Sequence, residues 1–405
     1  MPETLKGPAD LKRKLACKRD RTLARYKYYE MKHTTMDLGV ATPPELRWFT
    51  EILGWCSKAV DCMADRIQFK EFRDDNLGMN EIFQMNNIDI LTDSAVLSAC
   101  INSCSFIYIS PDETGYPRLQ VIDGGNATGE IDPITWLLKE GYAVLKRDSD
   151  TDAPTLEAYF TPNETIYYEN GKMTQSIKHD AGQVLLVPII YRPDDKRPFG
   201  HSRISRACMA LQDGAIRTIK RSEITAEFYS FPQKYAIGIS PDLELDKWKS
   251  TISSMLTITN DEDGNRPTVG QFNQQSVTPH LEQLKIFASL FAGETGLTMD
   301  DLGFPQDNPS SSEAIRAAHE TLRLTGRKAQ RSFGVGFLNA GYVAACLRDN
   351  FPYKRQVAYL TKPVFAPLFE LDNAGMAGLG DAILKLNQAV PDYIDAEKIK
   401  DLTGI

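Results

Sequence analysis

The sequence lacks any long apolar run. Its 405 residues are 42% hydrophobic and 25% charged, yet no stretch approaches the ~18 consecutive apolar residues of a membrane-spanning helix. The first 14 residues contain no apolar segment of the kind a secretory signal peptide carries. These absences exclude spanning helices and predict a chain made in the cytoplasm. The ordinary composition also excludes collagen-like, coiled-coil and wholly disordered chains, and the length predicts about two to three domains.

Cysteine is sparse and scattered, which excludes a disulfide framework. An odd set of seven in a long chain predicts reduced, buried thiols; they are Cys17, Cys56, Cys62, Cys100, Cys104, Cys208 and Cys346. Cys100 and Cys104 are four residues apart, which predicts one helix face and not the short loop spacing of a zinc knuckle. Structural cysteines are therefore favoured over metal ligands.

Recognisable catalytic motifs are also missing. None of the five histidines belongs to an H-E-x-x-H motif, and Gly200-His201-Ser202-Arg203-Ile204 fails the G-x-S-x-G pattern at its last position. Gly171-Lys172 is the only Gly-Lys pair and lacks the rest of a Walker A motif. The acidic turn at Asp261–Gly264 has Thr259 and Gly270 where a calcium loop needs its first ligand and its bidentate Glu. We therefore predict no enzyme, no cofactor and no metal site.

Positive charge is in deficit. The chain has 46 Lys and Arg against 54 Asp and Glu, a net charge of −8, which excludes a broad basic face that grips nucleic acid. Residues 1–32 depart from this balance, with ten Lys and Arg against four acids, so this segment is +6 and the remainder −14. One interpretation is a basic arm that binds a polyanion or an acidic partner. The other, which we favour, is a solvated helix face.

The first half of the chain predicts an α+β domain over about 1–198. Apolar periodicity predicts helices over 9–33, 46–66 and 79–104. Short apolar or β-branched runs separated by turn residues then predict strands between 106 and 191. Asn170-Gly171 between two such runs predicts a tight hairpin.

Helices return in the second half. Ser202 can cap a helix that continues to about Phe228, and Thr278-Pro279 begins another that stops at Gly296. Between them, 232–277 is a small interruption with two strands. Further elements follow in order: a polar loop at 303–309, a capping box at Ser310–Glu313, a long helix from Ala314 to about Asn350, a strand at 356–361 and helices at 378–389 and 395–402.

This order of elements resembles the portal, or head-to-tail connector, proteins of tailed bacteriophages, and most closely the portal family common in long-tailed phages. The blocks that carry the resemblance span most of the chain in order: Tyr28–His33, Pro198–Ser205, Ala226–Tyr235, Phe291–Leu297, Gln306–Arg316 and Leu379–Leu386. Each block is short, and their order and spacing make the resemblance specific.

The resemblance implies a helix-rich α+β portal fold that assembles into a dodecameric ring around a channel for double-stranded DNA. The implied parts are a wing (1–200), stem helix 1 (201–231), a small α/β clip (232–277), stem helix 2 (278–302), a tunnel loop (303–310), a long channel-side helix (311–350) and a return to the wing with a reduced crown (351–405). Location in the virion at one capsid vertex is implied as well.

The resemblance also assigns residues and partners. The tunnel loop that approaches DNA would contain Pro305, Gln306, Asp307, Asn308, Pro309 and Ser310. Basic residues of the long helix either line the channel or bridge neighbouring subunits: Arg316, Arg323, Arg327, Lys328 and Arg331. The clip, with Lys234, Lys247, Lys249 and Arg266, would dock the terminase large subunit and later the head–tail adaptor. Major capsid and scaffolding proteins are further implied partners.

A channel for sliding DNA needs weak phosphate contacts, because each neutralised phosphate adds affinity. The uncharged and acidic tunnel-loop candidates suit that need.

Two alternatives stay open: another phage structural component, such as a head–tail adaptor or minor capsid protein, and an intracellular enzyme whose site is assembled from distant residues.

Overall fold

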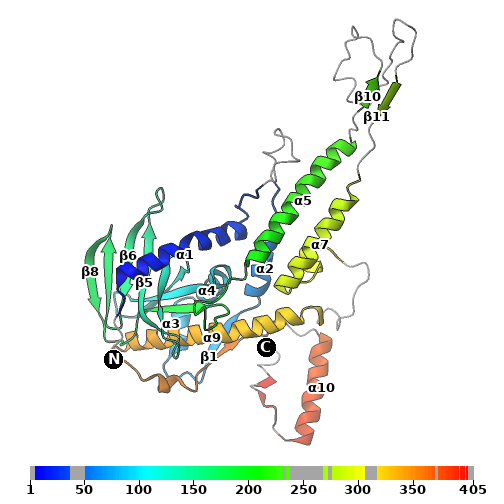
Figure 1. Ribbon diagram of the computed structural model, residues 1–405. Helices are drawn as coiled ribbons and strands as arrows, with labels where there is room; N and C mark the ends of the chain where they lie inside the picture. The colour runs from blue at the N-terminus through cyan, green and yellow to red at the C-terminus, as the bar shows by residue number, and fades with distance from the viewer. Residues whose placement is uncertain are drawn as a thin grey trace.

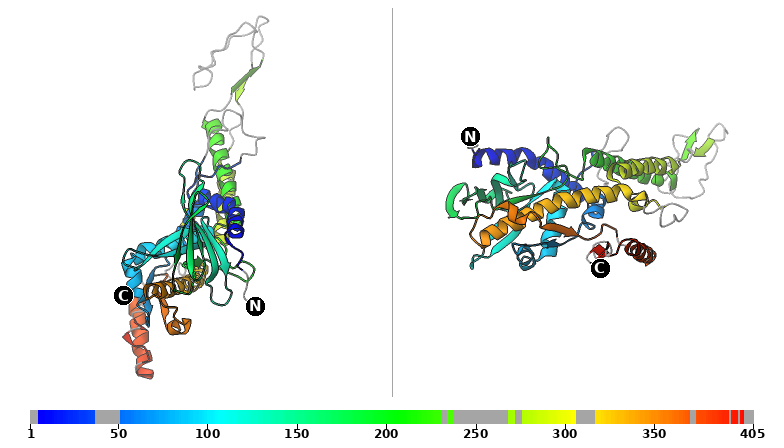
Figure 2. Two further views of the ribbon diagram at one scale, coloured as in Figure 1. Left: turned by 90° about the vertical axis from the view of Figure 1, so that its left-hand side faces the viewer. Right: turned by 90° about the horizontal axis from the view of Figure 1, so that it is seen from below.

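The computed structural model describes residues 5–36, 51–230, 234–237, 268–271, 276–305, 317–369, 373–391, 393–396 and 398–399. An α+β body carries a pair of helices that protrudes from one side, with a two-stranded ribbon beyond it (Figure 1). A separate helix, α10 (Asn373–Ala389), leaves the body on the opposite side, as a second view also shows (Figure 2).

The N-terminal helices differ from the sequence prediction in their bounds. They are α1 (Pro8–Tyr29), α2 (Trp55–Ala64), α3 (Met79–Met85) and α4 (Ile88–Asn102). The helix predicted over 46–66 begins only at Trp55 within the described residues, since 51–54 are not helical. The stretch predicted over 79–104 is two helices, because Asn87 adopts a left-handed conformation with φ of 54°, which asparagine tolerates better than most residues.

Two antiparallel sheets form the body. One has the order β3-β2-β9 and the other β4-β5-β6-β7-β8. The strands are β2 (Cys104–Pro111), β3 (Pro117–Asp123), β4 (Ala127–Ile131), β5 (Leu138–Arg147), β6 (Pro154–Phe160), β7 (Glu164–Glu169), β8 (Lys172–Lys178) and β9 (Leu186–Ile190). The predicted hairpin is confirmed: Asn170 and Gly171 join β7 to β8 with φ of 49° and 77°, the positive values of a type I′ turn.

A third, two-stranded sheet joins distant parts of the chain. β1 (Phe69–Arg73) pairs antiparallel with β12 (Lys362–Phe365). The strand predicted at 356–361 is wrong: Arg355–Ala358 forms the 3-10 helix η3, and the strand begins only at Lys362. Its partner lies about 290 residues away, so no local pattern could place it.

The N-terminal helix α1 is docked on the five-stranded sheet. Leu11 and Leu15 are buried against side chains of that sheet, including Tyr142 and Tyr159. Glu140, 1% exposed, accepts hydrogen bonds from the backbone N–H groups of Lys6 (2.8 Å) and Gly7 (3.0 Å). These contacts fix the start of the helix.

Basic side chains of α1 also bind the body. Lys12 pairs with Glu157 at 2.6 Å, and Lys14 with Glu130 at 2.7 Å. Lys18 donates to the Ala127 carbonyl at 2.7 Å, and burial lowers the pKa of its ammonium group. The prediction of a solvated helix face is therefore wrong for Lys14 and Lys18, which are partly buried, whereas Lys12 is 53% exposed at its ion pair. None of the three belongs to a free basic arm.

The long helix α9 (Glu320–Arg348) runs through the core, about 43 Å from end to end at 1.5 Å per residue. Phe337 lies among the rings of Phe69, Phe83 and Phe365. Gly336 lets the helix lie against β9, because a Cβ there would be 2.7 Å from a carbon of Ile189. This helix thus ties the first half of the chain to the second.

The cysteines follow the prediction with two exceptions. All seven are free; six are buried, but Cys17 is exposed. Cys100 lies in α4 while Cys104 begins β2, so the two do not share a helix face. The helix ends at Asn102 and Ser103 has φ of 85°, which turns the chain into the strand.

Candidate functional site

Two helices form a protruding stem. α5 (Arg206–Ser230) is about 37 Å long and packs against α7 (Thr278–Thr295). Ser205 bonds Glu294 at 2.8 Å near the base, Gly214 lies against the Phe287 ring midway, and Thr225 bonds His280 at 3.2 Å further out. The helices are therefore antiparallel, and Gly214 matters because a Cβ there would be 2.8 Å from the ring.

A buried arginine joins the stem to the body. Arg203 is 7% exposed. Its guanidinium donates to the Ala59 carbonyl in α2 and to the Thr295 carbonyl, at 2.8 Å, in the last turn of α7. The last carbonyls of a helix have no partner within the helix and carry its negative dipole end, so a cation satisfies them well. Arg203 thus holds α7, α2 and the start of α5 together.

The residues around Arg203 complete this joint. Ser202 donates to the Ile101 carbonyl at 2.5 Å and accepts from the Ile204 N–H at 2.9 Å. Gly200 has φ of 73°, and a Cβ there would be 2.1 Å from the Tyr191 carbonyl oxygen. The sequence pattern placed Ser202 as the cap of the helix, but α5 begins at Arg206, and Ser205 accepts from the Cys208 N–H at 3.2 Å. The role of Ser202 and Arg203 in the joint was missed, because their partners lie about 90 to 145 residues away in the chain.

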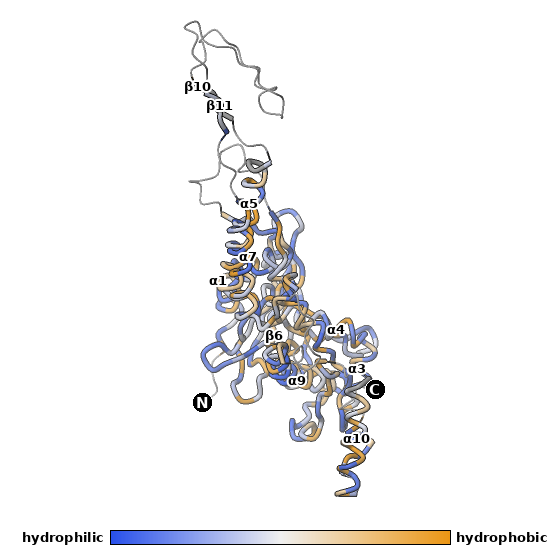
Figure 3. Tube along the Cα trace, turned by 90° about the vertical axis from the view of Figure 1, so that its right-hand side faces the viewer, coloured by the Kyte–Doolittle hydropathy of each residue, from blue (hydrophilic) through white to orange (hydrophobic). Residues whose placement is uncertain are grey.

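Several apolar side chains of the stem are exposed. On α7, Leu281, Ile286 and Leu290 are 51%, 60% and 55% exposed. Figure 3 shows hydrophobic positions along this helix. Ile286 and Leu290 are four residues apart and share one side of α7, and neighbouring exposed apolar side chains of this kind mark contact surfaces.

Beyond the stem, β10 (Lys234–Ile237) pairs antiparallel with β11 (Thr268–Gln271). The two strands predicted between 232 and 277 are present. Of the clip candidates, Lys234 begins β10, whereas Lys247, Lys249 and Arg266 lie outside the described residues.

The segment predicted as the tunnel loop is described only at its start. Pro305 is exposed, and Gln306, Asp307, Asn308, Pro309, Ser310 and Arg316 lie outside the described residues, as does the capping box. Asp301, in the 3-10 helix η2 (Asp300–Leu302), lies 3.4 Å from Nε2 of His319. Burial alone would raise the pKa of Asp301, but bonds from Thr298 and the nearby His319 outweigh it and lower that pKa. The two sides of the segment are therefore held near each other.

The basic residues of α9 divide into two kinds. Arg323 is bound by Glu320 through two hydrogen bonds of 2.6 and 2.7 Å. Arg327, Lys328 and Arg331 are exposed, and no ion pair to them is found within the described part of the chain. The structure therefore places these three on the surface, while the Arg323 guanidinium is held by a neighbour on the same helix.

Two classes of site are not found in the described residues. No group of three or more His, Cys, Asp or Glu side chains among them could hold a metal ion. No helix among them is long and apolar enough to cross a membrane. The described residues form a body, a stem and a ribbon beyond it.

The comparisons with known proteins give this architecture a family. The model of the family "Phage portal protein, SPP1 Gp6-like" matches residues 10–356. That range covers most of the body, the stem and all of α9, and it ends before β12. The chain therefore belongs to the phage portal protein family, as its sequence resemblance predicted, and this family is structural, not enzymatic.

Two curated relatives agree. The portal protein of Mycobacterium phage L5 is 26% identical over 339 residues, covering 78% of this chain and 69% of that protein. The portal protein of Mycobacterium phage D29 is 26% identical over 327 residues, covering 76% and 67%. This chain is thus similar to portal proteins over most of its length.

Similar chains also occur in solved structures of gene transfer agent particles. A chain in the neck of the empty particle matches with a TM-score of 0.49 and 12% identity, covering 95% of this chain and 93% of that one. A chain in the virion of the native particle matches with a TM-score of 0.48 and 11% identity, over the same shares.

Proposed function

We propose that this portal protein forms a dodecameric ring at one capsid vertex. The ring would be the channel through which double-stranded DNA is packaged and ejected. It would also be the docking platform for the terminase large subunit and for neck and tail proteins. The observation that carries the proposal is the family match over 10–356.

The arrangement of the chain supports a division into the parts of a portal. The body would be the wing (1–200), α5 and α7 the stem (201–231 and 278–302), and β10 with β11 part of the clip (232–277). Residues 303–310 would approach DNA, with 311–350 as the helix beyond them. Residues 351–405 would return to the wing with a reduced crown. The exposed apolar pair Ile286 and Leu290 on α7 suits a ring, in which each stem has neighbours.

The charge of the chain suits a duplex that slides. A ring of twelve copies carries twelve times the −8 of one chain, so its field repels DNA on average instead of holding it. Strong phosphate binding would slow passage, because each neutralised phosphate adds affinity.

Negative-stain imaging of the purified protein tests the ring directly. We expect particles with rotational symmetry and a central hole, and a native mass many times 45.4 kDa. A monomer at every concentration would refute the proposal. Particles without a hole would instead favour a head–tail adaptor or minor capsid protein.

Deleting residues 306–309 tests the proposed DNA-proximal segment. We expect rings to assemble normally, while phage carrying the deletion lose DNA packaging or retention, because only the contact with DNA changes. The measurement is infectivity together with encapsidated DNA per particle. A matched deletion in the exposed turn at 149–151 is the control and should leave both unchanged. Normal infectivity of the 306–309 deletion contradicts the assignment.

A further inference from the structure

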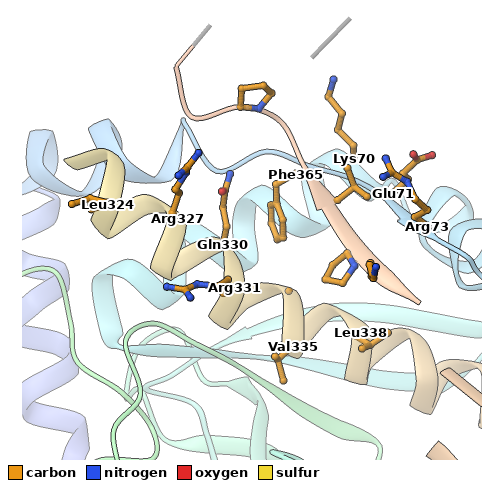
Figure 4. A pocket seen from close by; sticks show the side chains of 15 residues that line it. Lys70, Glu71, Arg73, Leu324, Arg327, Gln330, Arg331, Val335, Leu338 and Phe365 are labelled. Carbon is orange, nitrogen blue, oxygen red and sulfur yellow. The ribbon is translucent and has the colours of Figure 1, made fainter. Parts of the chain in front are cut away.

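A basic groove lies between α9 and the β1–β12 sheet of the body (Figure 4). Its volume is about 980 Å³. Cations from three elements line it, namely Lys70 and Arg73 on β1, Arg327 and Arg331 on α9, and Lys362 on β12. Among the lining residues that the structure describes, Glu71 is the only acid. In a chain with net charge −8, this is a local reversal of sign.

The groove is preformed. Gly334 brings α9 close to β12, because a Cβ there would be 2.7 Å from Pro363. Gln330 donates to the Ala366 carbonyl at 3.0 Å, and the ring of Phe365 packs 6.4 Å from that of Phe337 in the core. A partner therefore meets fixed walls and does not need to order them.

The same surface is apolar as well as basic. Leu324 and Val335 line the groove and are 55% and 40% exposed, and Phe365 lies between α9 and β1 (Figure 4). Arg331 and Val335 also line a second hollow of about 400 Å³ on the far side of α9, with Trp136 and Arg192. Both hollows are therefore lined by basic and apolar side chains.

We propose that this groove docks an acidic segment of another protein that also carries apolar side chains. Carboxylates would pair with Arg327, Arg331 and Lys362, and apolar side chains would cover Leu324 and Val335. A DNA backbone fits less well, because phosphodiester offers nothing apolar and Glu71 repels it. The wall strand β12 contains Pro363, which removes a backbone N–H, so the partner engages side chains and does not extend the sheet.

Fluorescence anisotropy with the full-length protein tests the proposal. The probe is a labelled 16-residue peptide with Leu at helical spacing and Glu elsewhere. Three comparison probes are used. One peptide has Ser in place of Leu, a second has Lys in place of Glu, and the third probe is a 20-base-pair DNA duplex. We expect the Glu–Leu peptide to bind best, and the Arg327→Gln, Arg331→Gln double variant to bind it about tenfold more weakly. Arg323→Gln is the matched control, one turn away and bound by Glu320, and should change affinity less than twofold.

Each other outcome overturns the proposal. Absence of peptide binding would leave the groove without this partner. Equal binding of the Ser peptide would show a purely electrostatic surface. A duplex that binds more tightly than the peptide, and is lost in the double variant, would assign the groove to DNA. A change in native mass of the double variant would assign it to a second copy of this chain.

Discussion

Replacing Arg203 with Met lowers the free energy of unfolding by about 3 kcal/mol, since hydrogen bonds to charged groups contribute about 1.5–3 kcal/mol each. The methionine fills a similar volume but donates no hydrogen bonds. The buried carbonyl oxygens of Thr295 and Ala59 therefore each lose the hydrogen bond that Arg203 donates to them. Urea unfolding followed by fluorescence measures the change. Trp55 is a suitable reporter because it is 6% exposed and its ring lies 5.5 Å from that of Phe291 in α7.

Arg206→Met is the matched control for this prediction. Arg206 is exposed at the start of α5, three residues further on, and such surface changes stay within about 0.5 kcal/mol. Protein concentration must be equal in all samples, because assembly would shift the apparent stability. If both variants lost the same stability, Arg203 would not join the stem to the body.

Local signals predicted much of the fold. The hairpin at Asn170-Gly171 depends only on two residues that accept positive φ, and it is present as expected. The start of α7 at Thr278-Pro279 and its end at Gly296, with φ of 72°, follow from residues within the helix ends themselves. Where a structure is decided by neighbours in sequence, the sequence pattern was sufficient.

Elements decided by distant contacts were missed. β1 and β12 pair across about 290 residues, and neither has an alternation strong enough to mark it alone. The lysines of α1 resembled a solvated face because their partners, Glu130 and Glu157, lie more than a hundred residues away. Contacts with the body, and not the composition of α1 itself, therefore decide which of its lysines are bound.

In the candidate site, too, local sequence predicted some features and distant contacts decided others. The cations of α9 were identified from the sequence, but only the structure separates Arg323, bound by Glu320, from the exposed Arg327 and Arg331. Lys70 and Lys362 line the same groove as these arginines, and no spacing along the chain connects them. The tunnel-loop residues 306–310 lie outside the described residues, and their role stays a prediction.

Gly200→Ala is expected to destabilise the joint even more strongly. Gly200 has φ of 73°, a backbone conformation that costs an L-residue about 1–2 kcal/mol. In addition, the new Cβ would lie 2.1 Å from the Tyr191 carbonyl oxygen, which accepts from the His201 N–H at 3.0 Å. Relieving that overlap must move the backbone entering the stem. We therefore expect a total loss of about 4 kcal/mol, an exceptional effect for one substitution, measured by urea unfolding as above.

Gly171→Ala separates the two contributions. Gly171 has a similar φ of 77° in the β7–β8 turn, but a Cβ there meets nothing within 4 Å. This variant should therefore lose only the conformational part, about 1 kcal/mol. The difference between the two variants measures the steric overlap at the base of the stem. Equal losses would mean that the backbone near Tyr191 yields freely, in which case the joint would not be the rigid connection that the contacts of Arg203 and Ser202 imply.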